Sequence, residues 1–148
     1  MSIPERAFFH GAALFEITES EHFTSMNKVP DMDSPSAYLL NHDTGLYVKH
    51  TAEDGSPWRF TFTPEHQGHV RRLFDRYGEK TFAVLVCGRV GICVISYGIL
   101  AGCVDLNHTE AEWLEVSRPN GGSFRVRGVR GQHDKAIPLN SFPRILFE

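Results

Sequence analysis

The sequence predicts a single α/β (α+β) domain in which a central mixed sheet is flanked by two amphipathic helices. Its 148 residues are 41% hydrophobic and 22% charged, which suits one ordinary hydrophobic core and argues against disorder. Short apolar runs with strand periodicity alternate with two helical stripes. This alternation predicts the order helix-strand-strand-strand-helix-strand-strand plus a C-terminal hairpin, with residues 1–148 forming one unit.

A first helix is predicted close to the N-terminus. Residues 2–5, Ser-Ile-Pro-Glu, carry a capping residue, a proline and a glutamate in the arrangement of a capping box. An apolar stripe at helical spacing is predicted to face the sheet, with a glycine allowing close approach, and comprises Phe8, Gly11, Ala12 and Phe15. Polar and chain-breaking residues then predict a long loop over residues 18–36.

Three strands are predicted next, as an antiparallel meander. Residues 37–41 and 46–51 are strand-like, and the turn between them contains Gly45, expected to supply an unusual backbone angle. Residues 58–63 alternate strictly between aromatic and polar side chains, which is typical of a half-buried strand. A tight polar connection joins this third strand to the second.

A second amphipathic helix is predicted from residue 64. Residues 63–65, Thr-Pro-Glu, repeat the start signal, and Gly78 ends the segment. The apolar positions at helical spacing are Val70, Phe74 and Tyr77.

The last part of the chain predicts more strands. Residues 81–87 and 91–96 are nearly continuous apolar runs, expected in the centre of the sheet, and residues 99–106 have a weak helical pattern. A hairpin is predicted with strands 112–118 and 123–129. The apolar tail is expected to dock on the body.

Bulk properties favour an intracellular protein without membrane contact. The net charge is −3, so the chain as a whole lacks a basic footprint. Cys87, Cys93 and Cys103 are an odd number in a chain that opens without an apolar signal-peptide core, which predicts a reducing cytoplasm and buried thiols that fill space. No apolar run approaches the ~20 residues that span a bilayer.

Basic residues gather in a few segments and allow two interpretations. Arginines interleave with aromatic residues at 58–60 and 124–127, as in surfaces that bind single-stranded nucleic acid. The same pattern also fits strands with one core face and one solvated face. The candidate nucleic-acid-binding residues are Arg59, Arg71, Arg72, Arg125 and Arg127.

The order of the elements over residues 4–97 resembles the core of the PD-(D/E)XK nuclease-like, or restriction-endonuclease-like, superfamily. The resemblance implies an acid on the first helix, an acid in the hairpin, and a strand carrying an acid-x-lysine triplet. Carried over to this chain, these are Glu16, Asp43 and Lys49. The two acids would hold one divalent cation such as Mg²⁺, and the lysine would support the attacking water.

One residue departs from that pattern. Tyr47 lies two positions before Lys49, where the superfamily has a carboxylate, and a phenol cannot replace one in holding a hard cation at neutral pH. Either Glu16 supplies the missing ligand or the site is inactive. Lys49 is alternatively an ordinary lysine with its stem buried.

Other catalytic motifs are absent or weak. His66 and His69 share one helix face, as a zinc site requires, but two ligands are too few and surface histidines are the alternative. No serine elbow, activated cysteine or phosphate-binding glycine loop is found. Two hypotheses follow: a non-catalytic, degenerate nuclease-like module that binds nucleic acid or a protein partner, or a metal-dependent nuclease.

Overall fold

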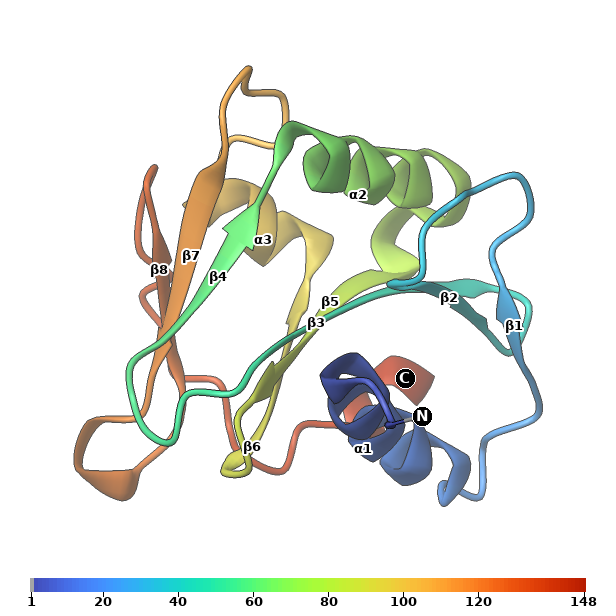
Figure 1. The fold of residues 1–148 in the computed structure, drawn as a ribbon, viewed down its shortest axis with the longest axis horizontal. Helices are drawn as coiled ribbons and strands as arrows, with labels where there is room; N and C mark the ends of the chain where they lie inside the picture. The colour runs from blue at the N-terminus through green and yellow to red at the C-terminus, as the bar shows by residue number, and fades with distance from the viewer. Residues whose placement is uncertain (1) are drawn as a thin grey trace.

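A computed structural model describes residues 2–148 and has α+β architecture, which confirms the predicted fold class (Figure 1). In this part of the chain there are two sheets, one mixed with five strands and one antiparallel with three. The helices are α1 (Glu5–Thr18), α2 (Pro64–Tyr77) and α3 (Tyr97–Cys103). The strands are β1 (Met26–Lys28), β2 (Ala37–Leu40), β3 (Thr44–Thr51), β4 (Trp58–Phe62), β5 (Thr81–Cys87), β6 (Gly91–Ser96), β7 (Glu112–Ser117) and β8 (Arg125–Gly128).

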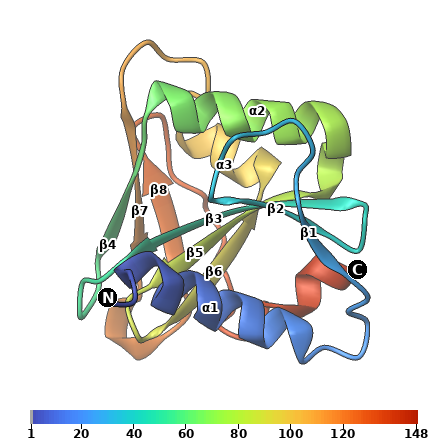
Figure 2. The ribbon, with the colours of Figure 1, turned by 45° about the vertical axis from the view of Figure 1, so that its right-hand side comes forward.

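The five-stranded sheet has the order β1-β2-β3-β5-β6. β3 and β5 are parallel, and the other neighbours are antiparallel. Helix α1 covers one face and α2 covers the other (Figures 1 and 2). Successive residues of β3 therefore contribute to two different cores: Leu46 and Val48 on the α1 face, and Tyr47 on the α2 face.

The predicted meander is wrong in its third strand. β4 does not pair with β3 but with β7, in the register Trp58↔Val116, and β8 completes this second sheet. The buried aromatic residues of β4 join the core on the α2 face of the larger sheet. Strict alternation predicted correctly that one side of this strand is buried, but it does not determine the partner strand.

The predicted orientation of α1 is also wrong. Its buried residues are His10, Ala13 and Ile17, while Phe8 and Phe15 are 62% and 64% exposed. A Cβ atom at Gly11 would meet nothing within 4 Å, so this glycine permits no close approach. The N-cap is Pro4, without a side-chain cap hydrogen bond, so the predicted capping box does not form.

Helix α2 confirms its prediction. The Thr63 hydroxyl accepts a hydrogen bond from the backbone N–H of His66 at 3.2 Å, and Gly78 ends the helix with φ 58°. Val70 and Leu73 are buried against the sheet. Phe74 is instead at the surface, where its ring stacks on Tyr97 at 4.0 Å between centroids.

Several connections differ in detail from the prediction. The positive φ angles in the β2–β3 turn belong to Asn41 and His42. Gly45 lies within β3, where a Cβ atom would come within 2.8 Å of the Tyr77 ring, so it permits the close packing of α2. The loop over residues 18–36 contains β1, and β6 is an edge strand, not a central one.

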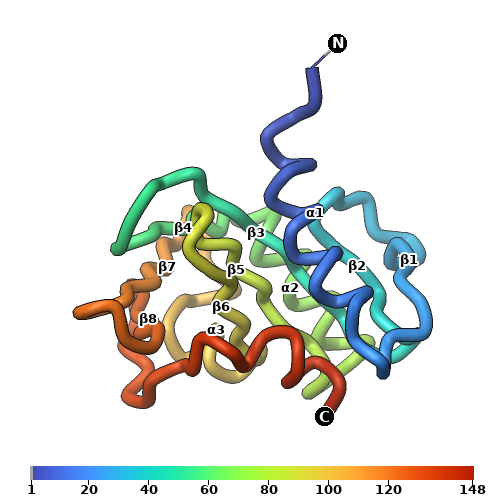
Figure 3. The backbone as a smooth tube through the Cα atoms, turned by 90° about the horizontal axis from the view of Figure 1, so that it is seen from below, coloured from blue at the N-terminus to red at the C-terminus, as the bar shows by residue number. Residues whose placement is uncertain are grey.

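The C-terminal segment docks on the body, as predicted. Phe142 and Leu146 are buried in the same core as Ala13 of α1, and the segment crosses the α1 side of the molecule (Figure 3). The three cysteines are free and buried. Over residues 2–148, no helix has the length and apolar character needed to cross a membrane.

Candidate functional site

The structure does not bring Glu16, Asp43 and Lys49 together. Asp43 lies in the β2–β3 turn, where its carboxylate accepts hydrogen bonds from Lys80 Nζ at 2.8 Å and from the Thr44 hydroxyl at 2.9 Å, and these bonds lower its pKa. Lys49 is six residues further on, which corresponds to roughly 20 Å along an extended strand. Glu16 belongs to α1, on the sheet face opposite to Lys49.

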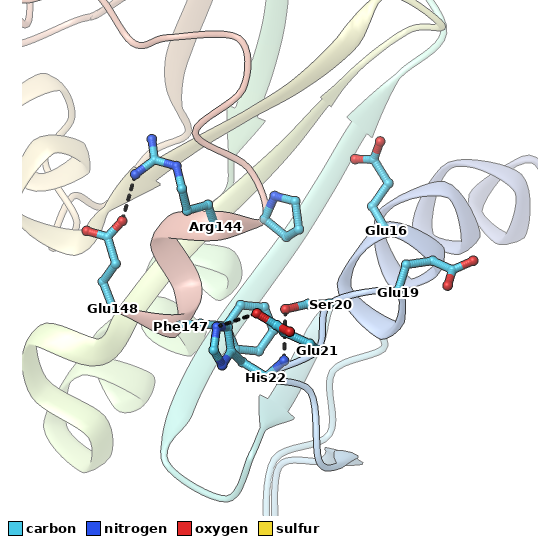
Figure 4. A pocket seen from close by; sticks show the side chains of 9 residues that line it. Glu16, Glu19, Ser20, Glu21, His22, Arg144, Phe147 and Glu148 are labelled. Atoms are coloured by element: carbon cyan, nitrogen blue, oxygen red, sulfur yellow. Dashed lines mark hydrogen bonds and ion pairs between the residues drawn. The ribbon is translucent and has the colours of Figure 1, made fainter.

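Glu16 instead lines a surface pocket of about 450 Å³ between the end of α1 and the C-terminal segment. In Figure 4, Glu16 and Glu19 extend from α1 on one side of this pocket, while Glu148 lies on the other side, paired with Arg144 at 2.8 Å. These carboxylates do not converge. Throughout residues 2–148, no group of three or more histidine, cysteine, aspartate or glutamate side chains is arranged to hold a metal ion.

Lys49 lies in a polar cluster under α2. Its ammonium lies 3.0 Å from His66 Nδ1 and 5.0 Å from the centroid of the Phe62 ring. Burial lowers the Lys49 pKa to about 8, and burial together with the Lys49 charge lowers the His66 pKa. The backbone N–H of Thr63 and the carbonyl oxygen of Thr61 each lie 3.3 Å from the same Nδ1.

A second pair in the same cluster joins Tyr47 to His69. The phenol oxygen lies 3.1 Å from His69 Nδ1, and burial raises the Tyr47 pKa to about 12. His69 Nε2 lies 3.9 Å from Glu65. His66 and His69 do share one helix face, but both face β3, and the nitrogens nearest to that strand are engaged by its side chains.

A basic and aromatic surface forms on the other sheet. The outward residues of β4, β7 and β8 alternate with the core residues, and Arg59, Glu115 and Arg127 occupy directly paired positions across the three strands. Arg125 is exposed on the same side of β8. We call this surface the outer face; it comprises Arg59, Thr61, Trp113, Glu115, Arg125 and Arg127.

Glu115 fixes two arginines on the outer face. Its carboxylate accepts hydrogen bonds from Arg59 Nη2 at 3.1 Å and from Arg127 Nε at 2.8 Å. Burial alone would raise the Glu115 pKa, but the two guanidinium groups outweigh this effect and lower it. The guanidinium carbons lie 4.4 Å (Arg59) and 5.4 Å (Arg127) from the centroid of the Trp113 ring.

The other two candidate arginines lie elsewhere. Arg71 and Arg72 project from α2 and donate to backbone carbonyls, Arg71 to Leu106 and Arg72 to Asp31. The outer face therefore unites Arg59, Arg125 and Arg127 only. Trp113 and Glu115 were not predicted from the sequence; their alternation with apolar neighbours in β7 indicates that they share one strand face, and the register places Glu115 opposite Arg59 and Trp113 opposite Thr61.

No protein-family model, curated protein or solved structure matches this sequence. Any function proposed for this chain therefore depends on the geometry of these side chains.

Proposed function

We propose that this chain is a non-catalytic module that binds single-stranded nucleic acid on the outer face. The observation that carries this proposal is the Trp113 ring with two guanidinium groups over it, both fixed by Glu115. Nonspecific single-strand binding uses this combination of stacking platforms for bases and positive charge for the backbone.

The arrangement suits a chain of bases and phosphates better than a single small ligand. Arg59 and Arg127 side chains are 56% and 53% exposed, so each guanidinium offers a planar surface and free N–H groups to solvent. Bases stack on such planes as they do on aromatic rings. Three arginines against one glutamate leave the outer face cationic, although the chain as a whole is acidic.

The nuclease alternative is less well supported. Hydrolysis assisted by Mg²⁺ needs converging oxygen ligands, and Glu16 and Asp43 do not fit this requirement because they lie apart and Asp43 is paired with Lys80. The geometry favours binding over cleavage.

The proposal is tested by fluorescence anisotropy with a labelled single-stranded oligonucleotide at several salt concentrations. Trp113→Ala is expected to weaken binding by about 5- to 150-fold, because stacking contributes about 1–3 kcal/mol per base. The double substitution Arg59→Ala/Arg127→Ala is expected to reduce the slope of log K against log salt by about 1.4, or about 0.7 for each phosphate that is no longer neutralised.

Arg89→Ala is the matched control for the single substitution Arg59→Ala, because Arg89 is an exposed arginine of the β5–β6 turn and each substitution removes one positive charge. If Arg89→Ala weakened binding as much as Arg59→Ala, the outer face would not be the interface. A parallel incubation of plasmid and single-stranded DNA with Mg²⁺ or Mn²⁺ tests the alternative. Cleavage that is lost in Lys49→Ala would contradict a purely binding role.

A further inference from the structure

A second pocket lies on the opposite side of the molecule from α2, between α1 and the segment that leads into β2. Its volume is about 340 Å³. Polar side chains come from four different segments, and apolar groups form the remaining wall. The polar lining residues are Arg6, His10, Lys28, Ser34 and Tyr38.

Two of these residues are cations without a counter-charge. Within residues 2–148, neither Arg6 nor Lys28 forms a side-chain ion pair or hydrogen bond, and no acidic residue is among those that line the pocket. Lys80 and Arg127, in contrast, each contact a carboxylate. Two like charges beside one cavity repel each other and attract an anion.

A hydrogen-bonded pair contributes further polar groups to the pocket. His10 is only 4% exposed, and its Nδ1 lies 3.0 Å from the Tyr38 hydroxyl. Burial, then the neighbouring charges of His50, Arg6 and Lys49, lower the His10 pKa to about 4. His10 is therefore neutral at pH 7, and if Tyr38 donates to Nδ1, the ring proton lies on Nε2.

We propose that this pocket binds a phosphate monoester, with Arg6 and Lys28 as its charge partners and the His10–Tyr38 pair as its hydrogen-bonding partner. A monoester carries about −1.5 to −2 charges at neutral pH, which matches the two cations; a carboxylate would leave one uncompensated. The apolar wall, formed by Ala7, Leu14, Pro35 and Ala37, would contact the organic part of the ester. This inference is independent of the proposed function, because none of these residues belongs to the outer face.

The test is isothermal titration calorimetry with phenyl phosphate, inorganic phosphate and benzoate. Phenyl phosphate is expected to bind saturably and at least 5-fold more tightly than benzoate. Arg6→Ala and Lys28→Ala are each expected to weaken it at least 5-fold, whereas Lys135→Ala and Arg89→Ala, which replace exposed cations elsewhere, leave it unchanged. The inference would be overturned if phenyl phosphate showed no saturable binding up to about 10 mM, a concentration above the millimolar dissociation constants of weak ligands. Equal binding of benzoate would also overturn it.

A second measurement is the His10 pKa, determined by histidine NMR with and without phenyl phosphate. This pKa would not change if Arg6 and Lys28 had only a structural role. Around His10 the titratable and charged groups are Arg6 on α1, Tyr38 on β2, Lys49 and His50 on β3, and Lys28 on β1, and the Glu5 carboxylate lies beyond His50 at 3.2 Å from its Nε2. The charges that shift the His10 pKa are those of His50, Arg6 and Lys49, and all of them lower it, so a dianion bound beside His10 would raise this pKa. An unchanged His10 pKa in saturating phenyl phosphate would contradict binding in this pocket.

The source of the phosphate is distinguished by a pair of short oligonucleotides, one with a 5′-phosphate and one with a 5′-hydroxyl. An Arg6-dependent preference for the 5′-phosphate supports the end of a nucleic acid strand as ligand, and equal binding of the two with retained phenyl phosphate affinity supports a small phosphorylated molecule. Trp113→Ala separates this inference from the proposed function. It is expected to reduce oligonucleotide binding while leaving phenyl phosphate binding intact.

Discussion

The two faces of the five-stranded sheet each carry a tyrosine hydrogen-bonded to a histidine. On the α2 face the pair is Tyr47 and His69, with 3.1 Å between the phenol oxygen and Nδ1. On the α1 face it is Tyr38 and His10, with 3.0 Å between the corresponding atoms. The chemistry of the two pairs is the same, so their surroundings decide what each can do.

The surroundings differ in one respect: on the α2 face the polar groups of the cluster contact one another, whereas on the α1 face the pair lies beside two exposed cations without a carboxylate partner. Lys49 contacts His66, and His69 has both Tyr47 and Glu65 beside it. The His10 pair instead borders a pocket shared with unpaired Arg6 and Lys28. We infer that the α2 cluster, although it contains a buried lysine, is structural, whereas the α1 cluster is available to a ligand.

The largest expected effect concerns the α2 cluster of Tyr47, Lys49, His66 and His69, which we call closed because its polar groups contact one another. Lys49→Met is expected to stabilise the protein by up to about 3 kcal/mol at pH 7, because burial lowers the Lys49 pKa from 10.5 to about 8 and one pKa unit corresponds to about 1.36 kcal/mol. Methionine fills similar space without the charge. Urea denaturation measures the free energy of unfolding, with Lys135→Met as the exposed control.

The same shift predicts a pH dependence for the wild-type protein. Between pH 8 and 10.5 the unfolded chain binds more protons at Lys49 than the folded chain does, so stability rises with pH in this window and Lys49→Met removes the rise. A destabilised Lys49→Met variant would indicate that the ammonium is a necessary partner of His66, and the contrast between the faces would then weaken.

The second-largest expected effect concerns the α1 cluster of His10, Tyr38, Arg6 and Lys28, which we call open because it borders a pocket. The His10 pKa is about 4 in the folded protein against an ordinary 6.5, so between these values the unfolded chain binds more protons. The free energy of unfolding is therefore expected to fall by about 2 kcal/mol as the pH drops from 6.5 to 4, less than the full pKa difference implies because the pocket admits solvent.

His10→Gln should remove this part of the pH dependence while keeping a polar side chain beside Tyr38. The comparison is made by urea denaturation of both proteins at several pH values between 4 and 7. Identical pH profiles for the two proteins would mean that His10 is not held neutral by its burial and its cationic neighbours.

The third effect compares the two tyrosines directly. Tyr47→Phe is expected to cost about 1 kcal/mol or more, because buried His69 loses its partner where water does not easily replace it. Tyr38→Phe should cost less than about 0.5 kcal/mol, since Tyr38 is half-buried and lines the pocket, so water can take the place of its hydroxyl although His10 itself is buried. Equal costs, measured by thermal or urea denaturation, would remove the distinction between a closed and an open pair.

The fold was predictable where the determining signals are local. Helix α2 begins at Thr63 because the cap and the helix are neighbours in sequence, and the β2–β3 and β7–β8 hairpins depend on short turns. The pairing of β4 was not predictable, because its partner Val116 lies 58 residues beyond Trp58 and alternation in one strand carries no information about another.

The same distinction between local and long-range signals applies to the candidate sites. The interleaved arginines correctly predicted that Arg59, Arg125 and Arg127 are solvent-facing, but Trp113 and Glu115 join them only through the register of β7. The resemblance to a nuclease core pointed to Glu16 and Asp43 through the order of the elements, which does not predict how far apart the two side chains lie. His10 was overlooked because a histidine was not counted as a residue of the buried stripe.

The smallest expected effect tests the orientation of α1, on which the open cluster depends. Phe8→Ser and Phe15→Ser are each expected to change the free energy of unfolding by less than about 0.5 kcal/mol, because both rings are more than 60% exposed. Ala13→Ser, which places a hydroxyl in the core of the α1 face, should cost about 1–3 kcal/mol. If the phenylalanine substitutions were the costly ones, α1 would be rotated, His10 would face solvent and the pocket would lose its hydrogen-bonding pair.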